Sequence, residues 1–201
     1  MSIAPSSRVL AQAIWQADGT LLWVKRAALV LFGIAALALA AKAKFPVPPS
    51  PVPVTLGTFA VLGIGAAYGP RLGLATIVGY LLIGAIGFDV FASSSAEKNG
   101  IPYMLGGSGG YLIGYVLATL ALGALATRGW DRSVVWMAVA MLIGNVLIYV
   151  PGLLWLSTFA ESWAQTFAWG LTPFLIGDAM KLALAALLLP ALWKLVGSAR
   201  G

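Results

Sequence analysis

The chain has 201 residues, of which 61% are hydrophobic and only 9% are charged. Soluble domains carry about 25% charged residues, so this composition excludes a water-soluble globule and predicts an all-α bundle that crosses the lipid bilayer. The excess of 12 Lys and Arg over 6 Asp and Glu fits the cytoplasmic loops of a membrane protein, and no basic run with interleaved aromatics suggests nucleic acid as a partner.

The absence of His and Cys narrows the chemistry further. Zinc sites built on those residues, thiol catalysis and Ser-His-Asp hydrolysis all need side chains that this chain does not contain. No GxxxxGKS or GxxxxGKT sequence occurs either, so the chain has no P-loop with which to hydrolyse ATP. We therefore expect no enzyme activity, no metal and no cofactor.

The first apolar run covers 27–41 and follows a mixed, basic segment at 1–26. A basic region before a short apolar core also fits a secretory signal peptide, but more apolar runs follow, so we interpret this run as the first membrane span. The later runs predict spans at 55–68, 72–91, 111–126, 134–150 and 171–196. We expect a six-helix membrane domain at 27–196, with cytoplasmic segments at 1–26 and 197–201.

The connection at 42–53 is dominated by proline. Its prolines are Pro46, Pro48, Pro49, Pro51 and Pro53. This spacing forbids a helix and enforces an extended conformation. The segment is either a rigid turn or a lid over a cavity, and the sequence alone leaves both readings open.

The distribution of basic residues predicts the orientation of the bundle. With the N-terminus inside, only Lys42, Lys44 and Lys98 fall on the outer side. The residues on the cytoplasmic side are Arg8, Lys25, Arg26, Arg71, Arg128, Arg132, Lys194 and Arg200. This bias predicts cytoplasmic termini for a multi-pass protein of the bacterial inner (plasma) membrane.

An acid and a base interrupt the last apolar run. Asp178 and Lys181 are three residues apart, so a helix projects them from nearly the same face. Charged groups at bilayer depth cost roughly 2.5–3.5 kcal/mol each and usually face a protein interior or a water-filled cavity. The pair is predicted to lie in the outer half of the bundle. Either it is a structural ion pair, or its lysine binds an anion while its aspartate accepts N–H donors from the same ligand.

Three other segments predicted on the outer side add candidates for a binding site. Thr55 begins the second span, where it also fits a role as a hydrogen bond between helices. The glycines at 106–110, ending in Gly110, open the fourth span and could bring backbone N–H groups and Tyr111 toward a ligand. Trp155 stands in the connection that follows the fifth span.

The first span carries small residues on one stripe. Gly33, Ala36 and Ala40 recur at helical spacing, which lets another helix approach closely. The partner is either a helix of this chain or a second membrane protein.

In chain order, the motifs resemble those of one known family. They are PVPVTLGTFAV at 51–61, GPR at 69–71, GAIG at 84–87, VFA at 90–92, GGSGGY at 106–111 and GDAMK at 177–181. The chain resembles the BioY family, the biotin-specific substrate-binding components of energy-coupling-factor transporters. The resemblance covers roughly 27–196.

The resemblance implies a six-helix bundle that binds biotin from outside. It works with a transmembrane, EcfT-like coupling protein and cytoplasmic ATPase subunits. Asp178 and Lys181 match the family's ligand-contacting acid and base, and Asn99 matches a polar loop residue. Ala36 and Ala40 match the stripe that docks on the coupling protein.

The chain departs from the family pattern at several positions. The family often has Gln at the position of Gly57 and Pro at that of Asp89, and the loop at 93–105 is longer and more charged here. Some members carry Arg where this chain has Leu112, which places more of the carboxylate recognition on Lys181. A stand-alone, proton-linked transporter of a small anion is the alternative function, with Asp178 or Lys181 as its proton site.

Overall fold

The computed structural model describes residues 9–14, 18–45, 54–95 and 97–198. Within this part, five helices are long and apolar enough to cross a membrane. They are built on α2 (Gly19–Lys42), α3 (Gly57–Ala85), α5 (Gly109–Thr127), α6 (Val134–Leu156) and α8 (Leu175–Ser198). The short elements are α1 (Leu10–Ile14), α4 (Gly100–Met104), α7 (Trp163–Gly170), and the 3-10 turns η1 (Trp130–Arg132) and η2 (Thr172–Phe174). The prediction of a helical membrane bundle is confirmed.

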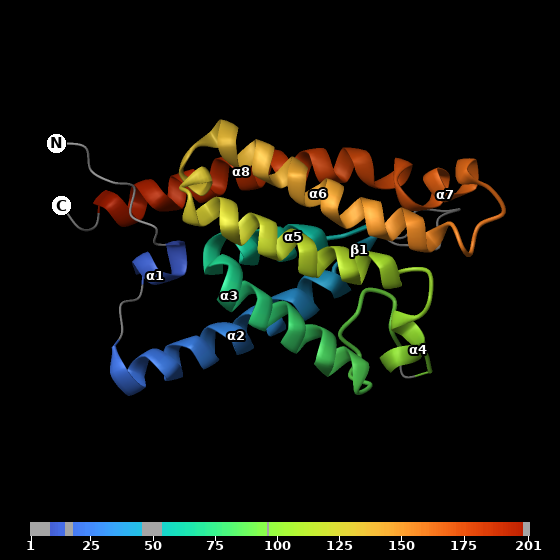
Figure 1. The fold of residues 1–201 in the computed structure, drawn as a ribbon, viewed down its shortest axis with the longest axis horizontal. Helices are drawn as coiled ribbons and strands as arrows, with labels where there is room; N and C mark the ends of the chain where they lie inside the picture. The colour runs from blue at the N-terminus through green and yellow to red at the C-terminus, as the bar shows by residue number, and fades with distance from the viewer. Residues whose placement is uncertain (1–8, 15–17, 46–53, 96, 199–201) are drawn as a thin grey trace.

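Two of the predicted spans lie within α3, which reverses direction in the middle. Gly69 has φ +78° and ψ 178°, outside the helical region, and Pro70 follows it. A Cβ on Gly73 would lie 3.5 Å from the Cα of Gly65, although eight residues of straight helix span about 12 Å. The chain therefore folds back as a helical hairpin, as Figure 1 shows for the teal and green arms of α3. The predicted spans 55–68 and 72–91 correspond to its two arms.

The second arm ends earlier than its apolar sequence suggested. The helix stops at Ala85, and Gly87 adopts φ +104° in the turn that follows. Phe91 then folds back onto the bundle and occupies the space where a Cβ on Gly84 would stand. Within this loop Phe91 is buried whereas Ile86 and Phe88 are exposed, so the apolar residues that follow Ala85 do not continue the span.

The first span is longer than predicted. Helix α2 begins at Gly19, eight residues before the predicted start at 27, and so includes Lys25 and Arg26. The Arg26 guanidinium lies 5.0 Å from the centre of the Trp23 ring. Charged residues near a membrane surface are tolerated when aromatic neighbours accompany them, so they mark the end of a span without ending its helix.

A two-residue strand pair follows α2. Strand β1 (Lys44–Phe45) pairs antiparallel with β2 (Val54–Thr55), with Lys44 opposite Thr55. This pairing returns the chain to the end of α2 before α3 begins. The predicted proline connector, at 46–53, lies outside the described residues.

The helices enclose two apolar clusters. One joins α5, α6 and α8 through residues such as Leu122, Met141 and Leu189. Val9 and Leu10, at the start of α1, also belong to it. The other joins α2 and α3 with Phe91 and Tyr103. Large apolar side chains on the outer faces of the helices, including Phe32 and Ile176, are exposed, as lipid contact requires.

The connections of the bundle gather at two ends. The reversal of α3, the link between α5 and α6, and the end of α8 lie together on the left of Figure 1. The β1–β2 pair, α4 and α7 lie on the right. Asp178 is in the first turn of α8, so the charged pair lies near the right-hand end.

Candidate binding site

The predicted acid and base form a buried ion pair. The Lys181 ammonium lies 2.9 Å from Oδ1 of Asp178, and both residues are less than a tenth exposed. They come from adjacent turns of α8, as their spacing predicted. A buried charge needs both a counter-charge and further hydrogen bonds, and the neighbouring helices supply them.

Side chains from two other helices complete this polar cluster. The Tyr149 hydroxyl on α6 donates a hydrogen bond to Oδ2 of Asp178. Lys181 donates a second hydrogen bond to Oγ1 of Thr58 on α3, at 3.0 Å. An ammonium has three N–H donors, so one remains for a ligand. The carboxylate keeps acceptor capacity on both oxygens.

A cavity opens beside this cluster. Two phenylalanines and five tyrosines line it, and the tyrosines are Tyr80, Tyr103, Tyr111, Tyr115 and Tyr149. Lys181 is the one charged side chain among the described residues of the lining. The walls come from α2, α3, α4, α5, α6 and α8, so the site exists only when the whole bundle is assembled. A mostly aromatic cavity with few polar groups suits a small organic ligand.

Two further predicted site residues line the same cavity. The Tyr111 hydroxyl donates to the carbonyl of Gly170 at 2.8 Å, which fixes its ring between α5 and α7. Thr55 on β2 accepts a hydrogen bond from the backbone N–H of Gly57 at 3.0 Å. Both hydroxyls are therefore engaged, and both residues shape the wall.

Four predicted site residues lie outside the cavity lining: Asp178, the ion-pair partner of Lys181, and three others. Asn99 precedes α4 and its Oδ1 lies beside Gly87. Gly110 packs against Pro151 and Trp155, where a Cβ would overlap α6. The indole N–H of Trp155 donates to the carbonyl of Gly106 at 2.9 Å. The glycine cluster and Trp155 thus hold α5 close to α6 and support the wall from behind.

Several site residues were missed by sequence analysis, among them Thr58, Tyr115 and Tyr149. Tyr115 is one helical turn beyond Tyr111, and the i, i+4 spacing of two tyrosines near the start of a span was a signal that both face one site. A Cβ on Gly57 would lie 3.3 Å from the Tyr115 hydroxyl, which makes no hydrogen bond within the described part of the chain. Tyr149 carried no such signal, because its importance depends on which helix lies opposite α8.

The small residues of the α2 stripe differ in what they contact. Gly33 packs inside the protein, where a Cβ would lie 2.6 Å from Cγ2 of Thr76. Ala36 and Ala40 are half-buried at the edge of that contact, beside the exposed Phe32 and Leu39. The stripe therefore serves internal packing at Gly33 and leaves Ala36 and Ala40 partly accessible.

Comparison with known proteins gives a consistent result. The model of the BioY family matches residues 10–198. A probable biotin transporter BioY of Pyrococcus horikoshii is 36% identical over 135 residues, which cover 67% of this chain and 76% of that protein. A biotin transporter BioY of Thermotoga maritima is 32% identical over 141 residues, covering 70% and 80%.

The fold also matches a solved structure. The crystal structure of the S-component for biotin from an ECF-type ABC transporter superposes with a TM-score of 0.74. The match covers 89% of this chain and 95% of that one, at 22% sequence identity. At this identity the likeness concerns the fold alone.

Proposed function

The chain belongs to the BioY family, and on this premise we propose that it is the biotin-binding membrane component of an energy-coupling-factor vitamin importer. Relatives named as biotin transporters match it over two thirds or more of its length. Its proposed role is to capture a ligand, because an apolar, aromatic lining with a few polar groups suits recognition.

The observation that carries the proposal is the polar cluster set in an aromatic cavity. Biotin has an apolar bicyclic ring, a ureido group with two N–H donors, and a carboxylate. The free N–H of Lys181 suits the carboxylate or the ureido carbonyl, and the spare acceptor sites of Asp178 suit the ureido N–H groups. The tyrosine rings provide the apolar surface that a thioether-containing ring needs.

The cavity end is proposed to be the outer side of the cell membrane. Lys42, Lys44 and Lys98 belong to segments at this end, whereas Arg71, Arg128 and Lys194 belong to segments at the other. This division supports a cytoplasmic location for the end at which α3 reverses. Biotin then enters from outside and meets Lys181 within the first two turns of α8.

We further propose that α2 docks on an EcfT-like coupling protein, which connects to the ATPase subunits. Helix α2 packs on α3 along one face only, and its opposite face exposes Leu31, Phe32 and Leu39. Ala36 and Ala40 lie at the edge of this face. Small residues beside exposed apolar ones favour close approach of another membrane helix.

Binding of biotin to the purified protein in detergent, measured by titration calorimetry, tests the proposal. We expect saturable binding at one site per chain that is weakened strongly in Lys181→Met. The matched control is Lys194→Met, since Lys194 is exposed on the opposite end of the same helix. No heat of binding in the folded wild-type protein would overturn the proposal.

The proton-linked alternative is distinguished by uptake in cells. Accumulation of biotin that needs the coupling protein and active ATPases supports the importer. Accumulation that persists without them and collapses with the proton gradient supports a secondary transporter instead.

A further inference from the structure

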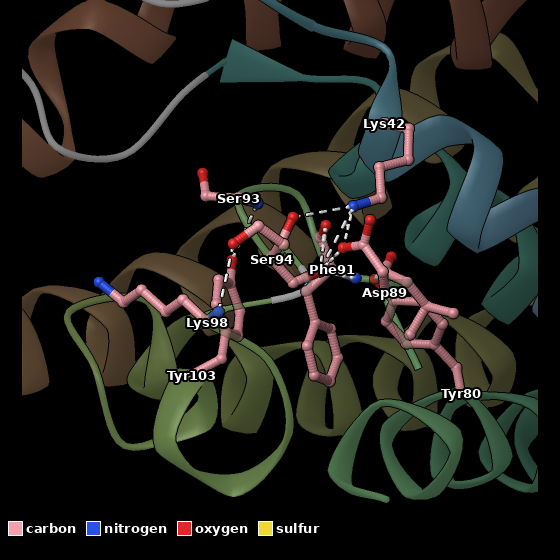
Figure 2. Close-up of polar contacts among 10 residues, drawn as sticks. Lys42, Tyr80, Asp89, Phe91, Ser93, Ser94, Lys98 and Tyr103 are labelled. Carbon is pink, nitrogen blue, oxygen red and sulfur yellow. Dashed lines mark hydrogen bonds and ion pairs between the residues drawn. The ribbon is translucent and has the colours of Figure 1, made fainter. Parts of the chain in front are cut away.

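A second polar cluster lies at the mouth of the cavity, outside the site described above. Lys42 is the last residue of α2, and its ammonium lies 2.5 Å from Oδ1 of Asp89. The same ammonium contacts the carbonyl of Ser94 at 3.2 Å and its hydroxyl at 3.4 Å. The Ser94 hydroxyl is 2.6 Å from Oδ1 of Asp89. Figure 2 shows these groups converging on the Lys42 ammonium from the loop that follows α3.

This cluster is connected directly to the cavity wall. The backbone N–H of Phe91 donates to the Ser94 hydroxyl at 3.0 Å. Phe91 and Ala92 line the cavity, and so does Ala41, the residue before Lys42. The ion pair therefore joins two walls of the mouth, the end of α2 and the loop at 86–95.

The Phe91 ring is the part of the loop that the cluster positions. It is 1% exposed and packs edge-on against Tyr80 and stacked on Tyr103, at centroid distances of 5.4 and 5.0 Å. The Tyr80 hydroxyl donates to the carbonyl of Val90 at 3.0 Å, which anchors the loop from α3 as well. Displacement of the loop would therefore remove an aromatic wall from the cavity.

We propose that the Lys42–Asp89 ion pair is a latch that holds the loop at 86–95 over the cavity and thereby sets how long a bound ligand stays. This inference rests on the proposed function, because it needs a ligand in the cavity. The two side chains are 32% and 51% exposed, so water and salt reach them. Exposed ion pairs are weak, which suits a contact that must open for entry and release.

The latch joins segments that are far apart in the sequence. Lys42 and Asp89 are separated by 47 residues, so the pair exists only when α2 and the loop are both in place. Lys98 belongs to the same connection and is also a cation, but it is exposed and forms no ion pair among the described residues. It offers a matched control for charge removal.

The test measures the rate at which labelled biotin dissociates from the wild type and from its variants. Asp89→Asn, Lys42→Met and the double variant remove the ion pair. Lys42→Asp with Asp89→Lys exchanges its charges, and Lys98→Met is the control. We expect dissociation about two- to five-fold faster in each latch variant. The double variant should be no faster than either single one, because both remove the same contact. The exchanged pair should restore slow release at least in part, and Lys98→Met should behave as wild type.

Two outcomes separate the latch from the proposed function. Normal biotin binding with unchanged dissociation in both Asp89→Asn and Lys42→Met overturns the latch alone. Absence of binding in the wild type overturns the proposed function and the residence-time role together.

A ligand-free measurement tests the structural basis of the latch. Hydrogen exchange of the amides at 86–95 should accelerate in Asp89→Asn and not in Lys98→Met. Equal exchange in the two variants would show that the ion pair does not hold the loop.

Discussion

The Tyr149 hydroxyl on α6 donates to one oxygen of the Asp178 carboxylate, and the Lys181 ammonium binds the other oxygen at 2.9 Å. Tyr149 and Asp178 are 29 residues apart in the chain and belong to neighbouring helices. The carboxylate is thus oriented by a fixed phenol on one side and a cation on the other. Both oxygens keep acceptor capacity for a ligand with N–H groups.

Removing the Tyr149 hydroxyl should weaken ligand binding and leave the shape of the cavity unchanged. In Tyr149→Phe the ring remains, but Asp178 loses the donor that fixes its orientation. A hydrogen bond to a charged group contributes about 1.5–3 kcal/mol, so we expect biotin affinity to fall about ten-fold or more. Calorimetry measures the change. Tyr68→Phe is the control, because the Tyr68 hydroxyl makes no hydrogen bond within the described residues; equal affinities in the two variants would contradict the role of Tyr149.

The ligand group that Lys181 contacts can be identified by combining a variant with an altered ligand. If Lys181 binds the carboxylate, biotin methyl ester should bind wild type and Lys181→Met with similar, weak affinity, because the ester has lost the negative charge. If Lys181 binds the ureido carbonyl, the ester should still distinguish the two proteins. We expect the first result, since Lys181 is the one charged side chain in the described lining. Competition against labelled biotin gives both affinities.

Tyr115 provides a hydroxyl group that is available to hydrogen-bond a ligand. Its hydroxyl lies beside Thr55 and Gly57 at the cavity wall and makes no hydrogen bond within the described chain. If the ligand uses this hydroxyl, Tyr115→Phe should lower biotin affinity by about two- to ten-fold, the equivalent of one neutral hydrogen bond. Thermal stability in the absence of ligand should stay unchanged. Unaltered affinity in calorimetry would remove Tyr115 from the recognition groups.

Much of this arrangement was predictable from the sequence because membranes impose strict patterns. Apolar length predicted the helices, and the i, i+3 spacing predicted that Asp178 and Lys181 share a face. The orientation that the placement of Lys and Arg indicates stays a prediction. The partners of that pair were not predictable. Thr58 and Tyr149 reach it through helix packing, which depends on side chains distant in the sequence.

For the glycine cluster, the sequence pattern fitted more than one structural role. Several glycines before a span fit both a ligand-binding loop and a close helix contact, and the sequence cannot distinguish these uses. In the structure Gly110 faces α6, where Pro151 and Trp155 occupy the space of a side chain. The reversal at Gly69 was marked in the sequence by the following Pro70, but its packing against Gly123 of α5 was not.

The latch should persist through mildly acidic conditions. Hydrogen bonds from Lys42 and Ser94 lower the pKa of the Asp89 carboxyl, and Lys44 on β1 adds a second positive charge. An acid with a lowered pKa contributes stability that is present above its ordinary value and is lost as the pH falls through the lowered one. Biotin release should therefore be constant from pH 7 to 5 and should accelerate only below about pH 4.

The Asp89→Asn variant shows whether Asp89 is the group whose protonation accelerates biotin release. Its release should already be fast at pH 7, and it should show a smaller acceleration on acidification than wild type. Stopped-flow measurement of biotin release across the pH range checks both statements. Parallel pH profiles in the two proteins would place the titrating group elsewhere.

The backbone conformation at the reversal of α3 leads to a prediction about stability, for which another glycine of α3 is the control. Gly69 adopts φ +78° and ψ 178°, a conformation that only glycine adopts without strain, so Gly69→Ala should cost about 1–3 kcal/mol. Its new Cβ would also lie 3.1 Å from Cγ1 of Val9. Gly63 belongs to the same helix but has nothing within 4 Å of its Cβ position, and there alanine should stabilise by about 0.5–1 kcal/mol. Thermal unfolding in detergent should therefore shift downward for Gly69→Ala and slightly upward for Gly63→Ala. Because both exchanges add the same methyl group to α3, shifts of equal sign would show that the conformation at Gly69 does not limit the stability of the hairpin.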